Sequence, residues 1–172
     1  MNIYLLRHAE AIERMEDSED AVRWLTPKGR KSIVKAAGQL RKLHVRPELV
    51  VTSPLVRAVQ TAELCAAIID CKALLQADAA LAPEGNAERV SKLIRNLKKV
   101  DELMLVGHEP LLGLVAAELL GMPQPPVLGK ASCLALELRG KAGKPAQFLW
   151  YAAAGKLNRS AKKFLASAAP PA

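Results

Sequence analysis

The stretch Ile3-Tyr4-Leu5-Leu6-Arg7-His8 joins a short apolar run to two basic residues. Two further runs, Leu49-Val50-Val51-Thr52 and Leu103-Met104-Leu105-Val106, are likewise followed by polar or basic side chains. Runs that stay apolar without alternation are typical of parallel strands covered on both faces. Longer segments of helical period separate these runs. The pattern therefore predicts an α/β fold, a three-layer αβα sandwich around a mostly parallel central sheet.

Weaker strands and several helix starts complete the predicted order of elements. Strands are expected over about 73–78, 133–138 and 147–151, and the last two can pair as an antiparallel edge across the turn at 140–145. Thr26-Pro27 and Ser53-Pro54 each place a capping hydroxyl before proline, which is a preferred helix start. Helices are expected over about 27–43, 54–69, 86–100, 110–121 and 156–166.

Length and composition favour one globular domain. The chain has 172 residues, of which 51% are hydrophobic and 24% charged, and this excludes a disordered or low-complexity chain. We expect a single domain over 1–167 and a frayed tail over 168–172, which contains two prolines. No signal peptide, membrane span or cysteine pattern for a disulfide or zinc is expected. The protein is therefore expected to be cytoplasmic and free of membrane partners.

The charge balance favours an anionic partner. The formal net charge is +8, which suits phosphate groups, nucleic acid or an acidic protein. Nucleic acid is disfavoured, because two Trp, two Tyr and two Phe offer few stacking platforms, and no recognised nucleic-acid motif is present. The basic segment from Lys156 to Lys163 is more typical of an amphipathic surface helix.

Functional side chains follow the three strong strands where each strand ends. Arg7-His8 end the first, Ser53 and then Arg57 follow the second, and Gly107-His108 follow the third. Ligands bind at the carboxyl ends of parallel strands in open α/β sheets. Two guanidiniums can grip phosphoryl oxygens, and the helix N-termini that follow two of these strands add backbone N–H donors. The pattern therefore predicts a phosphate site.

The histidines add a reactive group to this site. A neutral histidine can attack phosphorus at neutral pH, whereas an alcohol nucleophile must first lose its proton. His8 fits that role beside Arg7, and His108 is placed to stabilise oxygens that gain charge in the transition state. A lone histidine at a strand end is usually a surface or core residue, but four such residues at three strand ends are hard to explain by packing. His44 has no such company and is expected to be an ordinary helix-end residue.

These motifs resemble those of the histidine phosphatase superfamily, also called the phosphoglycerate mutase-like superfamily. The resemblance rests on Leu6-Arg7-His8-Ala9, Leu25-Thr26-Pro27-Lys28-Gly29, the segment from Thr52 to Ala62, and Val106-Gly107-His108-Glu109-Pro110, in the family's order and approximate spacing. The short chain and Leu81-Ala82-Pro83-Glu84-Gly85-Asn86 make it similar to the SixA-type phosphohistidine phosphatases. The resemblance covers residues 1 to about 160.

The resemblance implies roles for individual residues. His8 is expected to be the nucleophile that forms a phosphohistidine intermediate, with Arg7, Arg57 and His108 holding the phosphoryl group. Ser53 is a further substrate-binding candidate. The resemblance also implies a phosphoglycerate mutase-like fold without a large cap insertion, and activity that needs no metal and no cofactor.

Two departures from the family pattern bear on the chemistry. Ala9 stands where the family usually has glycine, which affects only the backbone shape behind the nucleophile. Pro83 stands where many larger members have a glutamate proton donor. Glu84 or Glu88 can replace that acid, with Glu84 as a substrate-binding candidate. The plainer alternative makes Glu84 a turn residue and Glu88 a first-turn helix acid.

The absent acid suggests a substrate. An alcohol leaving group needs a proton as it departs, whereas a phosphoimidazole protonated on its other nitrogen departs as neutral imidazole. A short connection between Arg57 and His108 leaves no room for a large cap, so an open pocket is expected. The acidic stretch from Glu10 to Asp20 is either a solvated loop or a border of the pocket that repels small anions. We therefore expect a phosphohistidine-bearing protein, such as a phosphotransfer or carrier domain, as partner and inorganic phosphate as product.

Two alternatives remain open at the level of sequence. A small-molecule phosphomonoesterase of the same superfamily would use the same residues, with Glu84 as acid. A non-catalytic phosphate-binding module would bind a phosphorylated partner without turnover. Loss of His8 distinguishes these classes, because it abolishes turnover in an enzyme and hardly weakens phosphate binding in a module.

Overall fold

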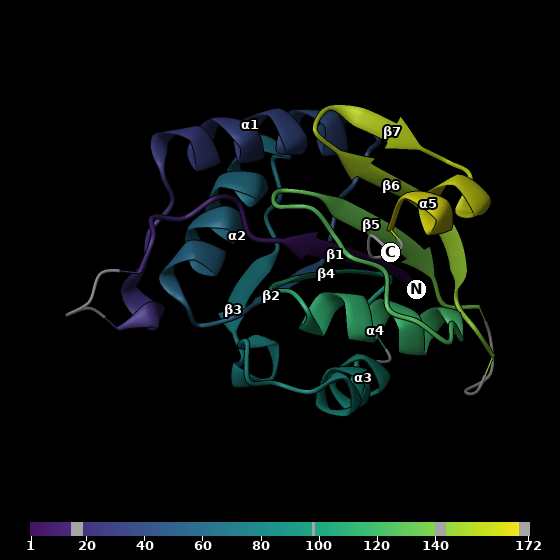
Figure 1. Cartoon of the computed structure of the whole chain (residues 1–172). Helices are drawn as coiled ribbons and strands as arrows, with labels where there is room; N and C mark the ends of the chain where they lie inside the picture. The colour runs from purple at the N-terminus through teal and green to yellow at the C-terminus, as the bar shows by residue number, and fades with distance from the viewer. Residues whose placement is uncertain (15–18, 98, 140–143, 169–172) are drawn as a thin grey trace.

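The computed structural model describes residues 1–14, 19–97, 99–139 and 144–168. These residues form a sheet of seven strands in the order β3-β2-β4-β1-β5-β6-β7 (Figure 1). The strands are β1 (Asn2–Arg7), β2 (Leu49–Thr52), β3 (Leu74–Ala77), β4 (Glu102–Gly107), β5 (Cys133–Glu137), β6 (Gln147–Ala153) and β7 (Lys156–Asn158). The pairs β1–β4, β2–β4 and β2–β3 are parallel, and β5, β6 and β7 add antiparallel pairs. The predicted α/β class is confirmed.

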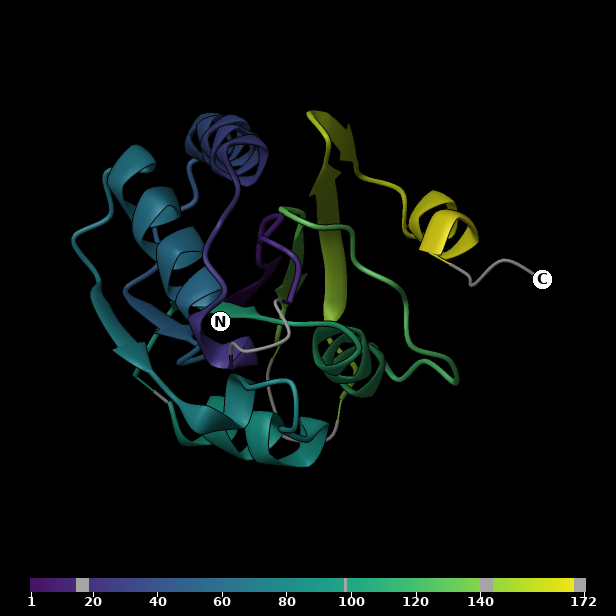
Figure 2. The same cartoon turned by 60° about the vertical axis from the view of Figure 1, so that its left-hand side comes forward.

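Helices cover both faces of the sheet (Figure 2). They are α1 (Pro27–Lys42), α2 (Val56–Ile68), α3 (Ala87–Asn96), α4 (Leu111–Leu120) and α5 (Ala161–Ala168), with the 3₁₀ turns η1 (Asp20–Val22) and η2 (Ala79–Leu81). One buried cluster packs α1 and α2 against the sheet. A second cluster packs α3, α4 and Phe164 of α5 against the opposite face. Three layers result, as the alternation of apolar runs predicts.

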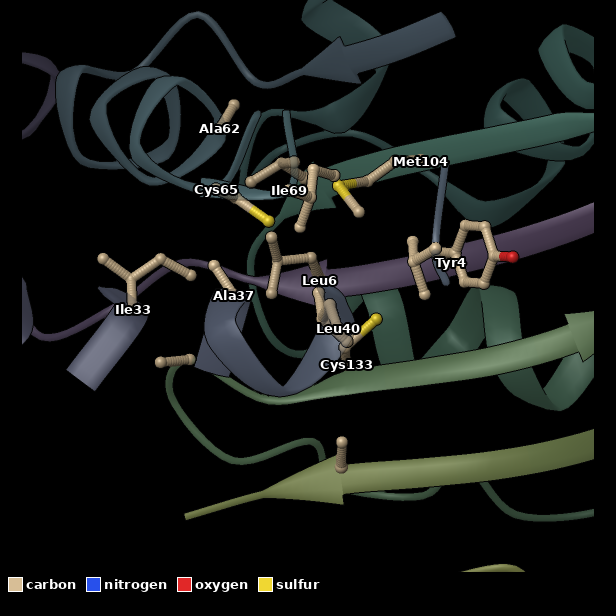
Figure 3. Packing of buried hydrophobic residues seen from close by; sticks show 14 of the residues in the cluster. Tyr4, Leu6, Ile33, Ala37, Leu40, Ala62, Cys65, Ile69, Met104 and Cys133 are labelled. Carbon is tan, nitrogen blue, oxygen red and sulfur yellow. The ribbon is translucent and has the colours of Figure 1, made fainter. Parts of the chain in front are cut away.

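The core beneath α1 and α2 is built from aliphatic and small side chains. Leu6 of β1 lies against Ile33, Ala37 and Leu40 of α1, and Cys65 of α2 approaches from the neighbouring helix (Figure 3). All of these side chains are buried. Apolar burial on both faces stabilises the central strands, so the loops that follow these strands start from fixed positions.

The helix starts agree with the sequence in one case and differ in another. Thr26 caps α1 as predicted, because its Oγ1 accepts a hydrogen bond from the Gly29 N–H at 2.9 Å and Pro27 begins the helix. The predicted start of α2 at Pro54 is wrong, since the helix begins at Val56. Ser53 is then outside the cap, and its hydroxyl is free to bond elsewhere.

The C-terminal segment also differs from the prediction. The antiparallel pairing of β5 with β6 is as expected, but residues 156–158 form β7 and the last helix begins only at Ala161. Ala154 and Gly155 both have positive φ in the turn between β6 and β7, as a two-residue hairpin requires. Alanine is a poor signal for such a turn, so the hairpin was not predicted. Ala168 belongs to α5, and the rest of the predicted tail, like the turn at 140–143, lies outside the described residues.

Candidate active site

The carboxyl ends of β1, β2 and β4 form one edge of the parallel half of the sheet (Figure 1). The hydrogen bonds to β4 continue one residue past the ends of β1 and β2. The His8 N–H donates to the Gly107 carbonyl at 3.0 Å, and the Ser53 N–H donates to the Val106 carbonyl at 2.9 Å. These bonds fix the backbone of both residues against β4. The structure thereby brings His8 and His108 together, with their ring centroids 4.8 Å apart.

The local contacts of His8 determine which ring nitrogen is reactive. Its Nδ1 lies 2.7 Å from the carbonyl oxygen of Ala9. A carbonyl only accepts, so Nδ1 carries the proton and Nε2 carries the free lone pair. The N–H of Ala9 donates to Thr61 Oγ1 at 3.1 Å, and Thr61 donates to the Arg57 carbonyl at 2.6 Å. The turn behind His8 is thus tied to the first turns of α2.

Alanine in place of glycine behind His8 creates no backbone strain. Among the described residues, the non-glycine positions with positive φ are His44, Asp70, Ala131 and Ala154, so Ala9 does not adopt the left-handed conformation that favours glycine. Ala9 is fully buried in the cluster beneath α1 and α2.

Gly29 permits a close approach nearby. A Cβ built on Gly29 would lie 2.0 Å from the Glu10 carbonyl oxygen, so a side chain there would push the segment after His8 away from α1.

His108 is held from behind by Ser53. The His108 Nε2 and Ser53 Oγ atoms are 2.8 Å apart, and both residues are buried. Ser53 Oγ also accepts from the Leu55 N–H at 3.3 Å. Nδ1 is therefore the ring nitrogen of His108 that does not take part in the contact with Ser53. Ser53 was predicted to bind substrate, but its hydroxyl is hydrogen bonded to His108 and to the backbone.

Arg57 projects from the first turn of α2 and is almost completely buried. Its side chain is 5% exposed. Nη1 donates to the Asp20 carbonyl and Nη2 donates to the Asp20 carboxylate, both at 2.7 Å. Asp20 belongs to η1, so the acidic segment after His8 borders the site here, as one of the two alternatives predicted. Residues 15–18 of that segment lie outside the described part of the chain.

Arg7 is held by the loop between α4 and β5. Its Nη1 donates to the Leu128 carbonyl at 2.6 Å, and its backbone N–H donates to the Ser132 carbonyl at 3.0 Å. The Ala131 N–H in turn donates to the His8 carbonyl at 3.2 Å. Within the described residues, Arg7 Nε is buried without a hydrogen-bond partner.

The surroundings keep both histidines neutral. Burial, with the positive charges of Arg57 and Arg7, lowers the pKa of His8 to about 4, although the Ala9 carbonyl opposes this shift. Burial, His8 and Arg57 lower the pKa of His108 to about 3. Near pH 7 the His8 Nε2 lone pair is therefore available, and the positive charge of the site comes from the guanidiniums.

The two glutamates considered as acids lie apart from this cluster. Glu84 is an exposed turn residue between η2 and α3, and across the described ranges no hydrogen bond or ion pair joins it to His8, His108 or either arginine. Glu88 is exposed on α3 and pairs with Lys92 at 2.8 Å, one helical turn away. Their placement agrees with the plainer alternative of a turn residue and a surface helix acid.

Sequence reasoning missed several groups that complete the site. In the sequence, Asp20 is one of several charges in an acidic stretch, and its place soon after the first strand is the signal that points to it. Thr61 lies within a recognised motif but was given no role. The Leu128 carbonyl had no signal, because any residue supplies a carbonyl. Among the residues with described positions, no group of three or more His, Cys, Asp or Glu is arranged to hold a metal ion.

The carboxyl edge of the parallel strands thus gathers two guanidiniums and two neutral histidines, a set of groups suited to a phosphoryl ligand. Comparisons with known proteins make the class specific. The model of the histidine phosphatase superfamily (branch 1) matches residues 3–82. A phosphohistidine phosphatase SixA homolog from Haemophilus influenzae is 33% identical over 135 residues, 73% of this chain and 80% of that protein. The chain therefore belongs to the histidine phosphatase superfamily.

Within the superfamily the similarity is to the SixA type. Phosphohistidine phosphatase SixA of Escherichia coli K12 is 28% identical over 140 residues, 80% of this chain and 86% of that protein. A structure of the protein histidine phosphatase SixA complexed with tungstate superimposes with a TM-score of 0.80 at 27% identity, covering 88% of this chain and 96% of that one. The phosphoglycerate mutase-like fold is thereby confirmed, and the described residues contain no large cap insertion.

Proposed function

We propose that this chain is a phosphohistidine phosphatase that accepts a phosphoryl group from a histidine of another protein onto His8 Nε2 and passes it to water. The observation that supports this most directly is the 2.7 Å contact between His8 Nδ1 and the Ala9 carbonyl. This contact leaves Nε2 as the nucleophilic nitrogen at the edge where Arg7, Arg57 and His108 also lie.

The first step exchanges one phosphorus–nitrogen bond for another. His8 Nε2 forms a bond to phosphorus while the bond from phosphorus to the substrate imidazole breaks. The electron pair of that bond returns to the substrate ring, which leaves as neutral imidazole if its second nitrogen already carries a proton. Arg7 and Arg57 bind the equatorial oxygens, and His108 donates a hydrogen bond to them.

The second step releases phosphate. Water forms a bond to phosphorus, the bond to His8 Nε2 breaks, and the protons of the water pass to the phosphate product and the solvent. Nδ1 of His8 stays protonated against the Ala9 carbonyl, so His8 also leaves phosphorus as a neutral ring. The residues of this chain provide the nucleophile and the positive charge for both steps.

Among the described residues, no carboxyl is hydrogen bonded to His8 or His108, and this favours phosphohistidine over a phosphate ester. Departure of an alcohol gains on the order of 10²–10⁴-fold from a positioned acid. Asp20 is the carboxyl that touches Arg57, and its hydrogen bonds with Arg23 and Arg57 lower its pKa to about 2, so it is ionised near pH 7. Glu84 is exposed on a turn. A neutral imidazole leaving group does not need either carboxyl as an acid.

A protein substrate is part of the proposal. The site lies at a sheet edge that no large insertion covers among the described elements, so a histidine presented by a phosphotransfer or carrier domain can reach His8. The relatives named for phosphohistidine support the same substrate class. In the part of the chain with assigned positions, no helix is long and apolar enough to cross a membrane. A cytoplasmic location remains a prediction.

Turnover of two substrates tests this proposal. Phosphate release is measured from a phosphohistidine-bearing carrier protein and from p-nitrophenyl phosphate, for the native chain and for His8→Asn. His44→Asn is the matched control, because His44 lies at the end of α1 with positive φ, which asparagine tolerates. We expect rapid release from the carrier, slow release from the ester, no release by His8→Asn and unchanged release by His44→Asn.

The other outcomes identify the alternatives. Equal turnover of the ester would contradict a phosphohistidine preference and favour a small-molecule phosphomonoesterase. Binding of phosphate without hydrolysis of either substrate would favour a non-catalytic phosphate-binding module.

A further inference from the structure

Asp20 occupies an unusual position for a carboxylate in a phosphate site. It meets Arg57 through two atoms, its carbonyl oxygen and Oδ2, each at 2.7 Å. Its other carboxylate oxygen accepts from Arg23 Nη1 at 2.8 Å, and Arg23 Nε donates to the Ile12 carbonyl at 2.7 Å. Asp20 is therefore fixed between the phosphate-binding arginine and an arginine of the surrounding loop.

The burial of this pair places Asp20 on the solvent side of Arg57. The Asp20 side chain is 38% exposed, whereas that of Arg57 is 5% exposed. The negative charge of Asp20 also acts on His108. A substrate that approaches the buried guanidinium from solvent therefore meets both charges.

Asp20 changes the charge that the site presents to a ligand. Near pH 7 both histidines are neutral, because burial and the arginines lower their pKa values to about 4 and about 3. Arg7 and Arg57 contribute two positive charges, and ionised Asp20 removes one of them. Asp20 therefore lowers the net charge of the inner site by one unit. Lys130 also acts on His8, and the half-buried Glu109 carboxyl, whose pKa burial raises, lies within electrostatic range of Arg7.

Ligands of different net charge respond differently to this arrangement. A fully ionised phosphate monoester carries two negative charges. A phosphoimidazole whose second nitrogen is protonated carries the same phosphoryl dianion and one positive charge on the ring, so its net charge is one negative. Its ring N–H is also a donor, and a carboxylate accepts hydrogen bonds from such a donor more strongly than a neutral group does.

We propose that Asp20 is a specificity-determining residue that lowers the net charge of the phosphoryl site to favour protonated phosphoimidazole groups over dianionic phosphate monoesters. This inference rests on the proposed function and deepens it, because it assigns the discrimination between the two substrate classes to one carboxylate. Asp20 acts on Arg57 and on the leaving group through charge and is not a proton donor.

Asp20→Asn tests the inference, because asparagine keeps the backbone carbonyl and a side-chain oxygen for Arg57 but removes the charge. The values of kcat/KM are measured for phosphoimidazole and for p-nitrophenyl phosphate. We expect the ratio of the value for phosphoimidazole to that for the ester to fall about tenfold. Removing one negative charge at this range improves the interaction energy of a dianion more than that of a monoanion. The ester should gain mainly through a lower KM.

Three further variants serve as controls. Glu19→Gln removes the same charge from the exposed neighbouring position and should leave the ratio unchanged. Asp20→Glu keeps the charge and should keep the ratio near that of the native chain. Asp20→Ser also removes the charge, with a smaller side chain. It replaces Asp20→Asn in the experiment if the asparagine variant does not fold.

The possible results separate this inference from the proposed function. An unchanged ratio in folded Asp20→Asn or Asp20→Ser, or an equal loss for both substrates, would overturn the role of Asp20 and leave phosphohistidine hydrolysis standing. Failure of the native chain to hydrolyse phosphoimidazole and the phosphorylated carrier would overturn the proposed function and this inference with it.

Discussion

The two halves of the sheet contribute to the site in different ways. In the parallel half, β1, β2 and β4 end at one edge and are followed by His8, Ser53 and His108. In the antiparallel half, strand ends alternate between the two edges. The loop that leads into β5 of this half supports the site through backbone atoms, because the Leu128 and Ser132 carbonyls accept from Arg7. The parallel strand ends gather the candidate catalytic side chains, and the loop before β5 positions Arg7.

Two buried serines, one directly after β2 and one directly before β5, give the sharpest test of this contrast. Ser53 Oγ lies 2.8 Å from His108 Nε2, whereas Ser132 Oγ is buried with no hydrogen-bond partner among the described residues. Ser53→Ala should lower kcat by about tenfold, because a lost hydrogen bond to a group that stabilises charge is worth roughly 1.5 kcal/mol. Ser132→Ala should leave kcat unchanged.

Both variants are compared by steady-state kinetics, with thermal unfolding as a check that they fold. Removal of an unpaired buried hydroxyl is expected to be neutral or slightly stabilising in Ser132→Ala. Equal losses of kcat in the two variants would contradict the distinction between reactive and supporting halves.

The pH dependence of stability also belongs to the parallel half. The folded pKa values of His8 and His108, about 4 and about 3, lie below the ordinary value of 6.5. Between these limits the unfolded chain binds more protons than the folded chain, so the free energy of unfolding decreases as the pH falls from about 6.5 to about 4. Asp20 further decreases the free energy of unfolding only below pH 3.8, the ordinary pKa of an aspartate.

Urea unfolding at several pH values measures this decrease. The slope should become shallower when His8 and His108 are both replaced by asparagine, because the unfolded variant then loses those two protonation sites. A slope in the double variant equal to that of the native chain would show that other groups are responsible.

The parts of the fold that were predicted from sequence are those with strong local patterns. The continuous apolar runs at β1, β2 and β4 identify buried parallel strands, and Thr26-Pro27 identifies the start of α1. The hairpin between β6 and β7 was missed because Ala154 is an uncommon residue for its left-handed position. Short antiparallel strands depend on pairing partners, which a local pattern does not contain.

The residues of the site likewise fall into those with a local sequence signal and those without one. Arg7, His8, Arg57 and His108 have strong sequence signals, because each lies at or soon after the end of a strong strand within a recognisable motif. Their roles stay predictions. Asp20 and the Leu128 carbonyl were not placed, since their positions depend on how two loops fold over the sheet edge. Ser53 contacts His108 through its hydroxyl, a contact that depends on tertiary packing, and its predicted role in substrate binding stays a prediction.

The central claim is that the phosphoryl group passes through His8, and trapping the intermediate tests it most directly. The native chain is mixed with the phosphorylated carrier, quenched in alkali within milliseconds, digested and mapped by mass spectrometry. We expect one phosphoryl group on the peptide that contains His8, and no phosphorylated peptide from His8→Asn. Turnover with the phosphoryl group found on His108, or with none found on the chain, would contradict the account.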